Sequence, residues 1–383
     1  MLPPLHLAFD ESSTPHDIRV RMSAGGRLVG TIFFRCESTP LVMTADTLLC
    51  LGLTPALEVH APLRVEGTVE ASLIANAAAI QEMLCSWYPA YRPIPVTAEV
   101  GSQTYPEGRG TGLFFSGGVD SSYSLASEKN RLDALITMVD AKTPGQRGPG
   151  AQRLVDGLAR AASTLRLEPI FVETNIRAMM QPFLGWIEFH GSAMAAIRHL
   201  LGDRFHTVLI ASSGDETAWF EPWGSHPGLD PLLGTPDARI EHHGLVKRFD
   251  KVRTILTEPV LMDGLHVCNT DPKKNCGQCS KCRFVMACLS VLDATEEAPS
   301  FPRDREYTPF RFKIEDAAVR SEYVYLRERA AATGRHARLI ADIDASIAAC
   351  KLPEKRRSVV ATADPGWRLR RLKHRARYWR ASR

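Results

Sequence analysis

The middle of the chain alternates short apolar runs with longer helical patterns. The apolar runs cover residues 112–115, 134–139, 169–172 and 208–211, and the helical patterns cover residues 121–129, 151–164 and 186–201. Strands that alternate with helices of this length predict βαβ units and therefore a parallel sheet. We expect a doubly wound α/β core over residues 105–300, with ligands bound at the carboxyl ends of its strands.

The segments on either side of this core have different patterns. In residues 16–35, apolar and polar positions alternate around Ala24-Gly25-Gly26, which predicts a β-hairpin. A second extended segment at residues 56–69 and a helix at residues 71–88 complete an α+β domain placed at residues 1–104. After the core, helices are expected at residues 281–292, 315–332 and 336–349. Residues 301–383 therefore form a helical extension with a basic tail.

The tail carries much of the positive charge of the chain. Residues 366–383 hold eight Lys or Arg and no acid, so the formal net charge of +4 leaves −4 for the remainder. Trp367, Tyr378 and Trp379 are interleaved with these cations, a pattern suited to contact with RNA or an acidic partner. A disordered solubilising end is the alternative.

Cysteine usage indicates a reducing compartment. Four of the nine cysteines lie within residues 268–282, which favours a metal site over a disulfide framework. The first residues lack a basic stretch and meet an acid at Asp10, unlike a secretory signal, and no window holds 18 uninterrupted apolar residues. We therefore expect a cytoplasmic protein without a membrane span.

A glycine-rich turn joins the first predicted strand of the core to the following helix. It reads Ser116-Gly117-Gly118-Val119-Asp120-Ser121-Ser122. Gly117 and Gly118 let the backbone approach an anion without obstruction by a Cβ atom, while Ser121 and Ser122 supply hydroxyl and N–H groups at the positive end of the helix. A chain of phosphates would fit there.

Asp120 distinguishes this turn from other phosphate loops. No Gly-Lys-Ser/Thr follows at the required spacing, and the turn is not a Gly-x-Gly-x-x-Gly dinucleotide loop. A carboxylate beside a polyphosphate is repelled unless a divalent cation lies between them, so Asp120 is a candidate Mg²⁺ ligand. The alternative is an ordinary Ser/Gly turn in which Ser121 caps the helix.

The turn resembles the signature of the N-type ATP pyrophosphatases, the family that contains GMP synthetase, asparagine synthetase and 7-cyano-7-deazaguanine synthase. These enzymes adenylate a carboxylate or carbonyl oxygen, and ammonia, an amine or sulfur then displaces AMP. The resemblance implies that ATP binds through Ser116, Gly117, Gly118, Val119, Asp120, Ser121 and Ser122. It also implies that Asp140, at the end of the second strand, lies near the adenosine.

The four clustered cysteines predict a metal site. Cys268, Cys276, Cys279 and Cys282 supply four thiolates within 15 residues, which matches a closed tetrahedral structural Zn²⁺ site. An iron–sulfur cluster has compatible spacing, and four unligated thiols are the remaining alternative. The arrangement resembles the four-cysteine zinc site of 7-cyano-7-deazaguanine synthases, although this chain adds long segments before the core and after the cysteines.

Two further segments offer candidate catalytic groups. Residues 219–231 follow the fourth strand and form either part of a pocket or a rigid surface loop. There, Asp230 could bind metal or orient the nucleophile, and His226 could act as a general base. Lys251 and Arg248 could reach the α-phosphate, as the position of a lysine in the family implies, or form a solvated basic face. His190 and His199 are expected to be packing or surface residues.

These features predict an AMP-forming ligase or amidating enzyme that adenylates a small molecule or conjugate with ATP and Mg²⁺, followed by attack of ammonia or an amine. The chain begins Met1-Leu2 rather than Met-Cys, so no glutaminase nucleophile is expected and ammonia would be free or supplied by a partner. One rival is a sulfur-inserting RNA modification enzyme with an iron–sulfur cluster. The other is a non-catalytic ATP-binding regulatory protein.

Overall fold

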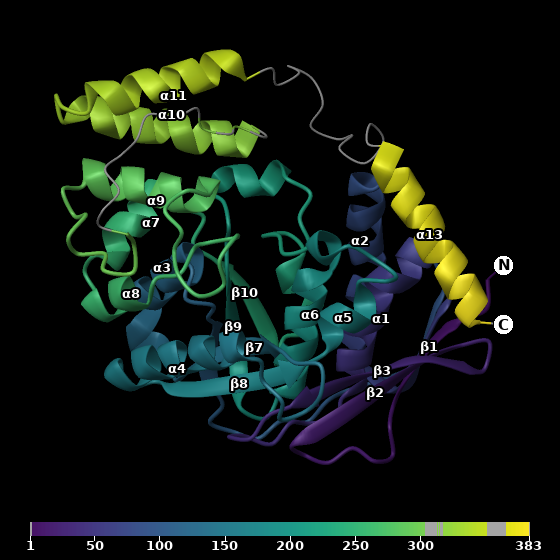
Figure 1. Cartoon of the computed structure of the whole chain (residues 1–383). Helices are drawn as coiled ribbons and strands as arrows, with labels where there is room; N and C mark the ends of the chain where they lie inside the picture. The colour runs from purple at the N-terminus through teal and green to yellow at the C-terminus, as the bar shows by residue number, and fades with distance from the viewer. Residues whose placement is uncertain (1, 303–311, 313, 315–316, 351–364, 383) are drawn as a thin grey trace.

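The computed structural model describes residues 2–302, 312, 314, 317–350 and 365–382, which form an α/β protein around one ten-stranded sheet (Figure 1). The strand order is β10-β9-β6-β7-β8-β3-β2-β1-β4-β5. Most neighbouring strands are parallel, as the sequence predicts for the core.

The five strands of the core are all parallel. They are β6 (Gly110–Phe114), β7 (Ala134–Asp140), β8 (Glu168–Thr174), β9 (Phe205–Ala211) and β10 (Arg239–His243). The chain starts at β6, winds outward through β7 and β8, and then returns to place β9 on the other side of β6. The winding direction therefore reverses between β6 and β9, and in such sheets ligands bind at this point, beyond the carboxyl ends of the strands.

The N-terminal strands continue the same sheet. They are β1 (Leu5–Phe9), β2 (Asp17–Ala24), β3 (Arg27–Arg35), β4 (Leu63–Glu70) and β5 (Val96–Gly101). The predicted hairpin is confirmed: β2 and β3 pair antiparallel, and Gly25 and Gly26 both adopt positive φ in the two-residue turn between them. β3 then pairs antiparallel with β8. The sheet thus runs across the boundary predicted between residues 104 and 105.

The extended segment predicted at residues 56–69 is wrong in its first part. Helix α1 (Ala45–Val59) ends there, and strand β4 begins only at Leu63. Every residue of α1 is buried, so it has no polar face whose spacing could reveal a helix. The helix predicted after it is confirmed as α2 (Ala71–Trp87).

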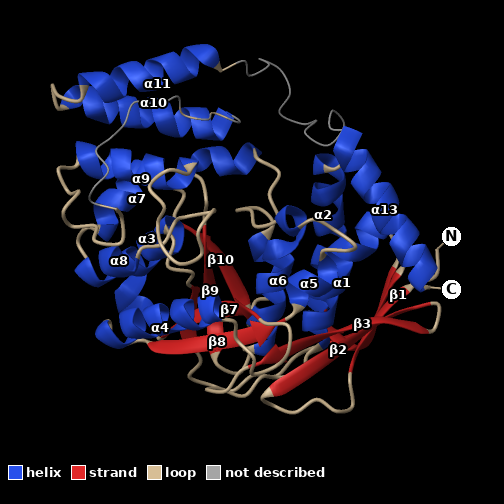
Figure 2. Ribbon diagram, in the orientation of Figure 1, coloured by secondary structure: helices blue, strands red, loops and turns tan. Residues whose placement is uncertain are grey.

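Helices cover both faces of the sheet (Figure 2). The helices α1, α2, α5 (Ile176–Met180) and α6 (Trp186–Leu200) share one apolar core with the N-terminal strands. The opposite core contains α3 (Val119–Glu128), α4 (Pro149–Thr164), α7 (Arg248–Ile255), α8 (Pro259–Gly264), α9 (Ser280–Val291), α10 (Ala317–Ala332) and α11 (Ala337–Ala349). The predicted core helices are therefore present. None of the described helices is long and apolar enough to cross a membrane.

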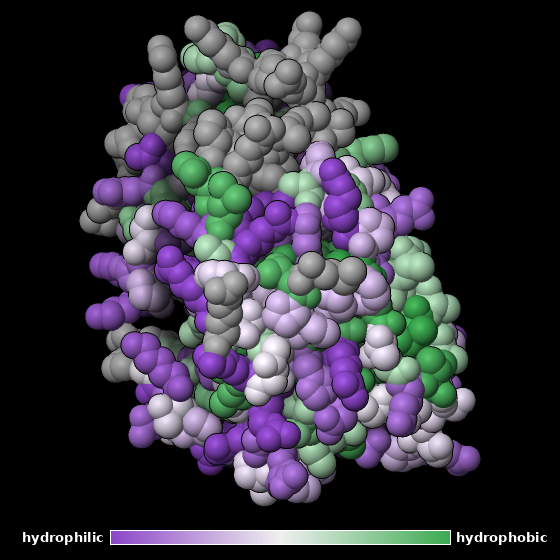
Figure 3. Space-filling view, turned by 90° about the vertical axis from the view of Figure 1, so that its right-hand side faces the viewer, coloured by the Kyte–Doolittle hydropathy of each residue, from purple (hydrophilic) through white to green (hydrophobic). Residues whose placement is uncertain are grey.

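The basic tail contains a helix, α13 (Pro365–Ala381), which packs along α1. Arg371 donates to both carboxylate oxygens of Glu58 at 3.0 and 3.1 Å, and both side chains are buried. Tyr378 donates to the carbonyl of Pro3. The alternative of a disordered end is therefore wrong for residues 365–382. Figure 3, from the side of α13, shows hydrophilic side chains over much of this face with apolar areas between them.

We expect Arg371→Met to lower the free energy of unfolding by about 3 kcal/mol, because the carboxylate of Glu58 then remains buried without its cation. Denaturant unfolding and limited proteolysis of the tail would measure the loss. Lys373→Met is the matched control, since Lys373 is an exposed cation on the same helix. Equal stability of the two variants would contradict this role of the ion pair.

A second buried acid makes stability depend on pH. Asp46 of α1 accepts a hydrogen bond from the backbone N–H of Glu70 at 2.8 Å, and its Oδ2 lies 3.9 Å from Nδ1 of His199. Burial raises the pKa of Asp46 to about 6. The folded protein therefore retains a proton that the unfolded chain releases, and this stabilising contribution is lost as the pH rises from about 4 to about 6.

We expect Asp46→Asn to remove this pH dependence, because asparagine cannot ionise and still offers an acceptor to Glu70. Relative to the wild type, the variant should gain on the order of 2 kcal/mol between pH 4.5 and pH 7.5. Thermal unfolding at the two pH values measures the difference. If the stability of the variant relative to the wild type is the same at both pH values, the raised pKa of Asp46 is contradicted.

Candidate functional site

The loop between β6 and α3 closes on itself through serine hydroxyls. Oγ of Ser121 accepts from the backbone N–H of Ser116 and lies 3.2 Å from the hydroxyl of Ser116. Gly117 adopts φ +72°, and a Cβ atom there would lie 3.1 Å from Leu158. The predicted strand–loop–helix arrangement is confirmed, and this position favours glycine both by conformation and by space.

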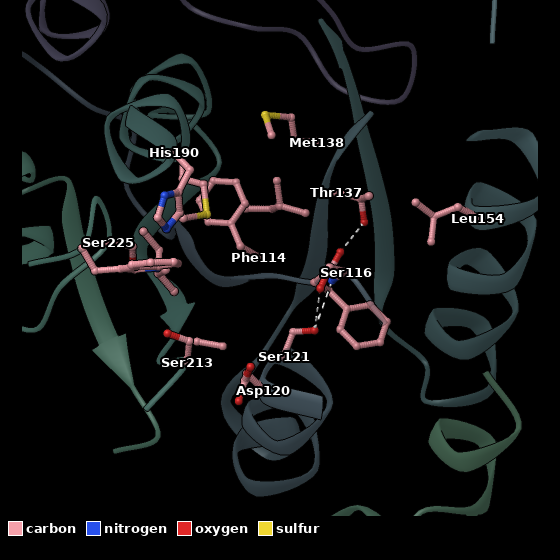
Figure 4. Close-up of a pocket in the computed structure, with 16 residues that line it drawn as sticks. Phe114, Ser116, Asp120, Ser121, Thr137, Met138, Leu154, His190, Ser213 and Ser225 are labelled. Atoms are coloured by element: carbon pink, nitrogen blue, oxygen red, sulfur yellow. Dashed lines mark hydrogen bonds between the residues drawn. The ribbon is translucent and has the colours of Figure 1, made fainter. Parts of the chain in front are cut away.

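Two pockets meet at this loop. One, of about 280 Å³, lies beyond the carboxyl ends of β6, β7 and β9, and the other, of about 310 Å³, lies between the loop and the cysteine segment. Ser116, Asp120 and Ser121 line both. We call them the strand-end pocket and the cysteine-side pocket. Figure 4 shows the first, with Asp120 at the start of α3 and His190 on the opposite wall.

The remaining loop residues differ in their access to these pockets. Gly118 and Val119 line the cysteine-side pocket. Ser122 is buried, its backbone N–H donates to the carbonyl of Gly118, and it is not part of either lining. Gly117 is not part of the lining either. Of the loop residues predicted to bind ATP, all except Gly117 and Ser122 therefore line at least one of the two pockets.

Asp120 lies beside the two cations that the sequence predicts for the site. Lys251 Nζ is 2.9 Å from Oδ1 of Asp120, and Nη2 of Arg248 is 3.9 Å from Oδ2. Burial alone would raise the pKa of Asp120, but the positive charges of Lys251 and Arg248 outweigh this effect and hold the pKa below its ordinary value. Asp120 is therefore ionised at neutral pH.

The first turns of α7 direct these cations toward the loop. Lys251 is 1% exposed and also donates to the carbonyl of Ser212 at 2.6 Å, just beyond β9. Arg248 donates to the carbonyl of Ser213 at 2.8 Å. The alternative of a solvated basic face is therefore wrong for Lys251, because its ammonium group is buried against the loop.

Asp140 does not reach either pocket wall. Its side chain is 56% exposed and lies 3.9 Å from Arg177. Ile136, Thr137 and Met138 of the same strand line the strand-end pocket instead. Asp140 is the last residue of β7, so the prediction that it ends the second core strand is confirmed. Its side chain, however, is not among those that line either pocket.

Asp230 and His226 organise the segment after β9. The buried carboxylate of Asp230 accepts from Ser225 Oγ at 2.7 Å and lies 2.7 Å from Nδ1 of His242. Nδ1 of His226 accepts from the backbone N–H of Gly228, and Nε2 lies 3.3 Å from the carbonyl of Trp219. Both nitrogens of His226 thus contact the backbone, and neither His226 nor Asp230 is among the residues that line the two pockets.

His190 is a wall residue that the sequence did not reveal. It lines the strand-end pocket together with Trp223 and Ser225. Its Nδ1 lies 3.1 Å from the carbonyl of Ile187, which assigns the proton to Nδ1 and leaves Nε2 as an acceptor in the neutral ring. Burial lowers the pKa of His190. Helical spacing alone could not show that this face of α6 borders a cavity. His199, by contrast, is buried as expected of a packing residue.

The four predicted metal ligands come together. The sulfur atoms of Cys268, Cys276, Cys279 and Cys282 all lie within 4.8 Å of one another. The backbone N–H groups of Gln278 and Cys279 donate to Sγ of Cys276, and that of Asp271 donates to Sγ of Cys268. Such N–H···S bonds stabilise thiolates. This cluster could hold a metal ion such as zinc.

The cysteine cluster is joined to the loop between β6 and α3 by a backbone hydrogen bond. The N–H of His266 donates to the carbonyl of Gly117 at 3.0 Å. Val267 donates to Oδ1 of Asn275, and Asn275 donates back to the carbonyl of Leu265, so the segment before Cys268 is braced from within the cluster. Cys268 itself lines the cysteine-side pocket. A metal ion there would fix one wall of that pocket.

No protein-family model matches the chain, and no match is found among curated proteins.

We expect the purified protein to contain metal at the cysteine cluster. Cys276→Ser should lose the metal and, with free metal at about a hundred times its Kd, should lose about 3 kcal/mol of stability. Elemental analysis and thermal unfolding measure the two effects, and Cys85→Ser, a half-buried thiol outside the cluster, is the control. Retention of metal by Cys276→Ser at the level of the control would rule out the site. Iron and visible colour would identify an iron–sulfur cluster instead of zinc.

Proposed function

We propose that this chain is an ATP-dependent, AMP-forming ligase of the ATP pyrophosphatase type. It would transfer the adenylyl group of ATP to a carboxylate or carbonyl oxygen of a small molecule or conjugate and release pyrophosphate. Ammonia or an amine would then displace AMP. The observation that carries the proposal is the position of Asp120, which lies at the junction of two chemically different pockets and beside two cations.

The two pockets differ in charge. Among the described residues that line the strand-end pocket, none is Lys or Arg, and its wall includes Phe114, Met138 and Trp223. The cysteine-side pocket contains Arg248 and Lys281. A nucleoside, which carries no charge, suits the first pocket, and a polyphosphate suits the second. The α-phosphorus would then lie at the junction, where Ser116, Asp120 and Ser121 meet.

The start of α3 offers donors to that phosphate chain. Gly118 is the N-cap residue, and no side chain caps the first turn of this helix. The backbone N–H groups in the first turn of α3 are therefore not used by a capping side chain. They could donate to a bound anion at the positive end of the helix. Together with Lys251 and Arg248, they would stabilise the charge that develops as pyrophosphate leaves.

Asp120 suits a Mg²⁺ site of the kind that relies on substrate phosphates. Its carboxylate is ionised, is 29% exposed and faces both pockets, and Mg²⁺ commonly takes one or two carboxylates and completes its coordination with phosphates and water. Bound Mg²⁺ would neutralise phosphate charge. Without it, Asp120 would repel the nucleotide.

In the reaction, the substrate oxygen attacks the α-phosphorus, and the bond to the bridging oxygen breaks so that pyrophosphate leaves with the electron pair. Lys251 does not line either pocket but contacts Asp120, which lines both, and its contacts with Asp120 and with the carbonyl of Ser212 limit its motion. A cation fixed in this way can stabilise the transition state without reorganising. The apolar walls of the strand-end pocket would shield the adenylate from water.

We expect Asp120→Asn to lower the rate of AMP and pyrophosphate release by about 100-fold or more, because it removes the charge that holds Mg²⁺. The assay screens carboxylate- and carbonyl-bearing small molecules with ATP and Mg²⁺ and measures AMP and pyrophosphate. Asp140→Asn is the control, since that carboxylate ends the neighbouring strand outside both pockets.

Three outcomes would overturn the proposal. ADP as the product would indicate cleavage of a different bond. Equal rates for Asp120→Asn and Asp140→Asn would show that the loop is not the reaction site. ATP binding without turnover across the screen would favour the non-catalytic regulatory protein, and turnover that requires a sulfur donor and an iron-containing cluster would favour RNA modification.

A further inference from the structure

The cysteine-side pocket contains a cation that the sequence did not single out. Lys281 lies on the first turn of α9, between the predicted metal ligands Cys279 and Cys282, and lines this pocket. Gly118 and Val119 of the loop line the same pocket. Lys281 therefore lies in the cysteine segment and faces the same pocket as the start of α3.

Lys281 differs from the other cations of the site in its partners. Lys251 and Arg248 lie beside Asp120, and Lys247 is 2.7 Å from Asp215. Within the described ranges, Lys281 has neither an ion pair nor a side-chain hydrogen bond, and its residue is exposed. Its ammonium group can therefore bind an anion without first breaking an existing contact.

The charge of Lys281 acts on the loop. Its positive charge is one of those that hold the pKa of Asp120 below the ordinary value, after the opposing effect of burial and the larger effects of Lys251 and Arg248. The pocket also presents Asn269 and His266 as polar groups. A ligand with several negative charges and a length of two phosphates matches a pocket of about 310 Å³ that two cations, Arg248 and Lys281, line.

We propose that Lys281 binds the pyrophosphate portion of the nucleotide, and that the cysteine cluster, by fixing the first turn of α9, sets the affinity of the protein for pyrophosphate. This inference rests on the proposed function, because it assumes that a polyphosphate occupies the cysteine-side pocket. It adds that the metal cluster is a positioning element of the nucleotide site as well as a structural one.

The geometry explains why the cluster would control the position of Lys281. Cys279 is the N-cap residue of α9 and Cys282 lies in its first turn, so ligands on both sides of Lys281 would belong to one tetrahedral site. Loss of the metal would release the two ligands that flank Lys281, Cys279 and Cys282, at once. It would also loosen Cys268, which lines the same pocket.

The test measures equilibrium binding of inorganic pyrophosphate with Mg²⁺ to the full chain by titration calorimetry. Lys281→Met should weaken binding about tenfold, the change expected from the loss of one charge-assisted contact. Lys281→Arg should restore most of the affinity. Lys274→Met is the matched control, because Lys274 is an exposed lysine of the same segment that does not line the pocket, and its affinity should be that of the wild type.

The role of the cluster is tested by removing the metal with a chelator and repeating the titration. The metal-free wild type should bind pyrophosphate at least tenfold more weakly, while Lys281→Met should lose little more when its metal is removed, because both changes act through the same contact. Circular dichroism checks that the sheet remains folded, and elemental analysis checks that Lys281→Met binds metal normally.

The outcomes separate this inference from the proposed function. Equal pyrophosphate affinities of the wild type and Lys281→Met would overturn the inference while leaving adenylation in place. An equal effect of metal removal in both proteins would overturn the positioning role of the cluster. If the wild type binds neither pyrophosphate nor ATP, the proposed function fails and the inference fails with it.

Discussion

The ion pair between Asp120 and Lys251 joins two segments that are 131 residues apart in sequence. One is the first turn of α3, after the first core strand, and the other is helix α7, which follows the last core strand. Because Lys251 also donates to the carbonyl of Ser212 beyond β9, it ties the carboxyl ends of β6 and β9 together. These are the strands between which the winding of the sheet reverses, so one buried ammonium group holds Asp120 at the place where such sheets bind ligands.

The rest of the fold supports this junction from both faces. The N-terminal segment does not merely precede the core: α1 packs against α6, and the hydroxyl groups of Thr54 and Ser192 lie 3.1 Å apart across that contact. Helix α6 in turn presents His190 and Met194 to the strand-end pocket. On the other face, the cysteine segment contacts the loop through His266 and Gly117. The strand-end pocket and the cysteine-side pocket therefore each have a wall formed by segments outside the parallel sheet.

Local patterns predicted the parts of this structure that are specified locally. The strands of the core, the hairpin at Gly25 and Gly26, and the strand–loop–helix unit at Ser116 follow from apolar spacing and turn residues. The cysteine spacing likewise predicted a cluster that the fold brings together. Helix α1 was not predicted because it is buried on all sides, so its sequence has no amphipathic period.

Side-chain direction could not be obtained from the sequence in the same way. The position of Asp140 at a strand end was predicted, but its carboxylate lies near Arg177 and away from the pocket. His226 and Asp230 were chosen for their chemistry, yet their polar atoms contact neighbouring groups of the same segment and His242. His190 and Lys281 have ordinary local surroundings in the sequence, and only the packing of α6 and α9 places them at the pockets.

The C-terminal helices help to position the two cations of α7, Arg248 and Lys251. Glu322 of α10 accepts a hydrogen bond from the backbone N–H of Arg248 at 3.0 Å, at the positive end of α7, and Tyr325 donates to Asp250 at 2.7 Å. An acidic group at a helix N-terminus stabilises that end of the helix. Because the outer side of α7 is held by α10, its inner side keeps Arg248 and Lys251 directed at Asp120. The helical extension is therefore part of the scaffold that holds these two cations beside Asp120.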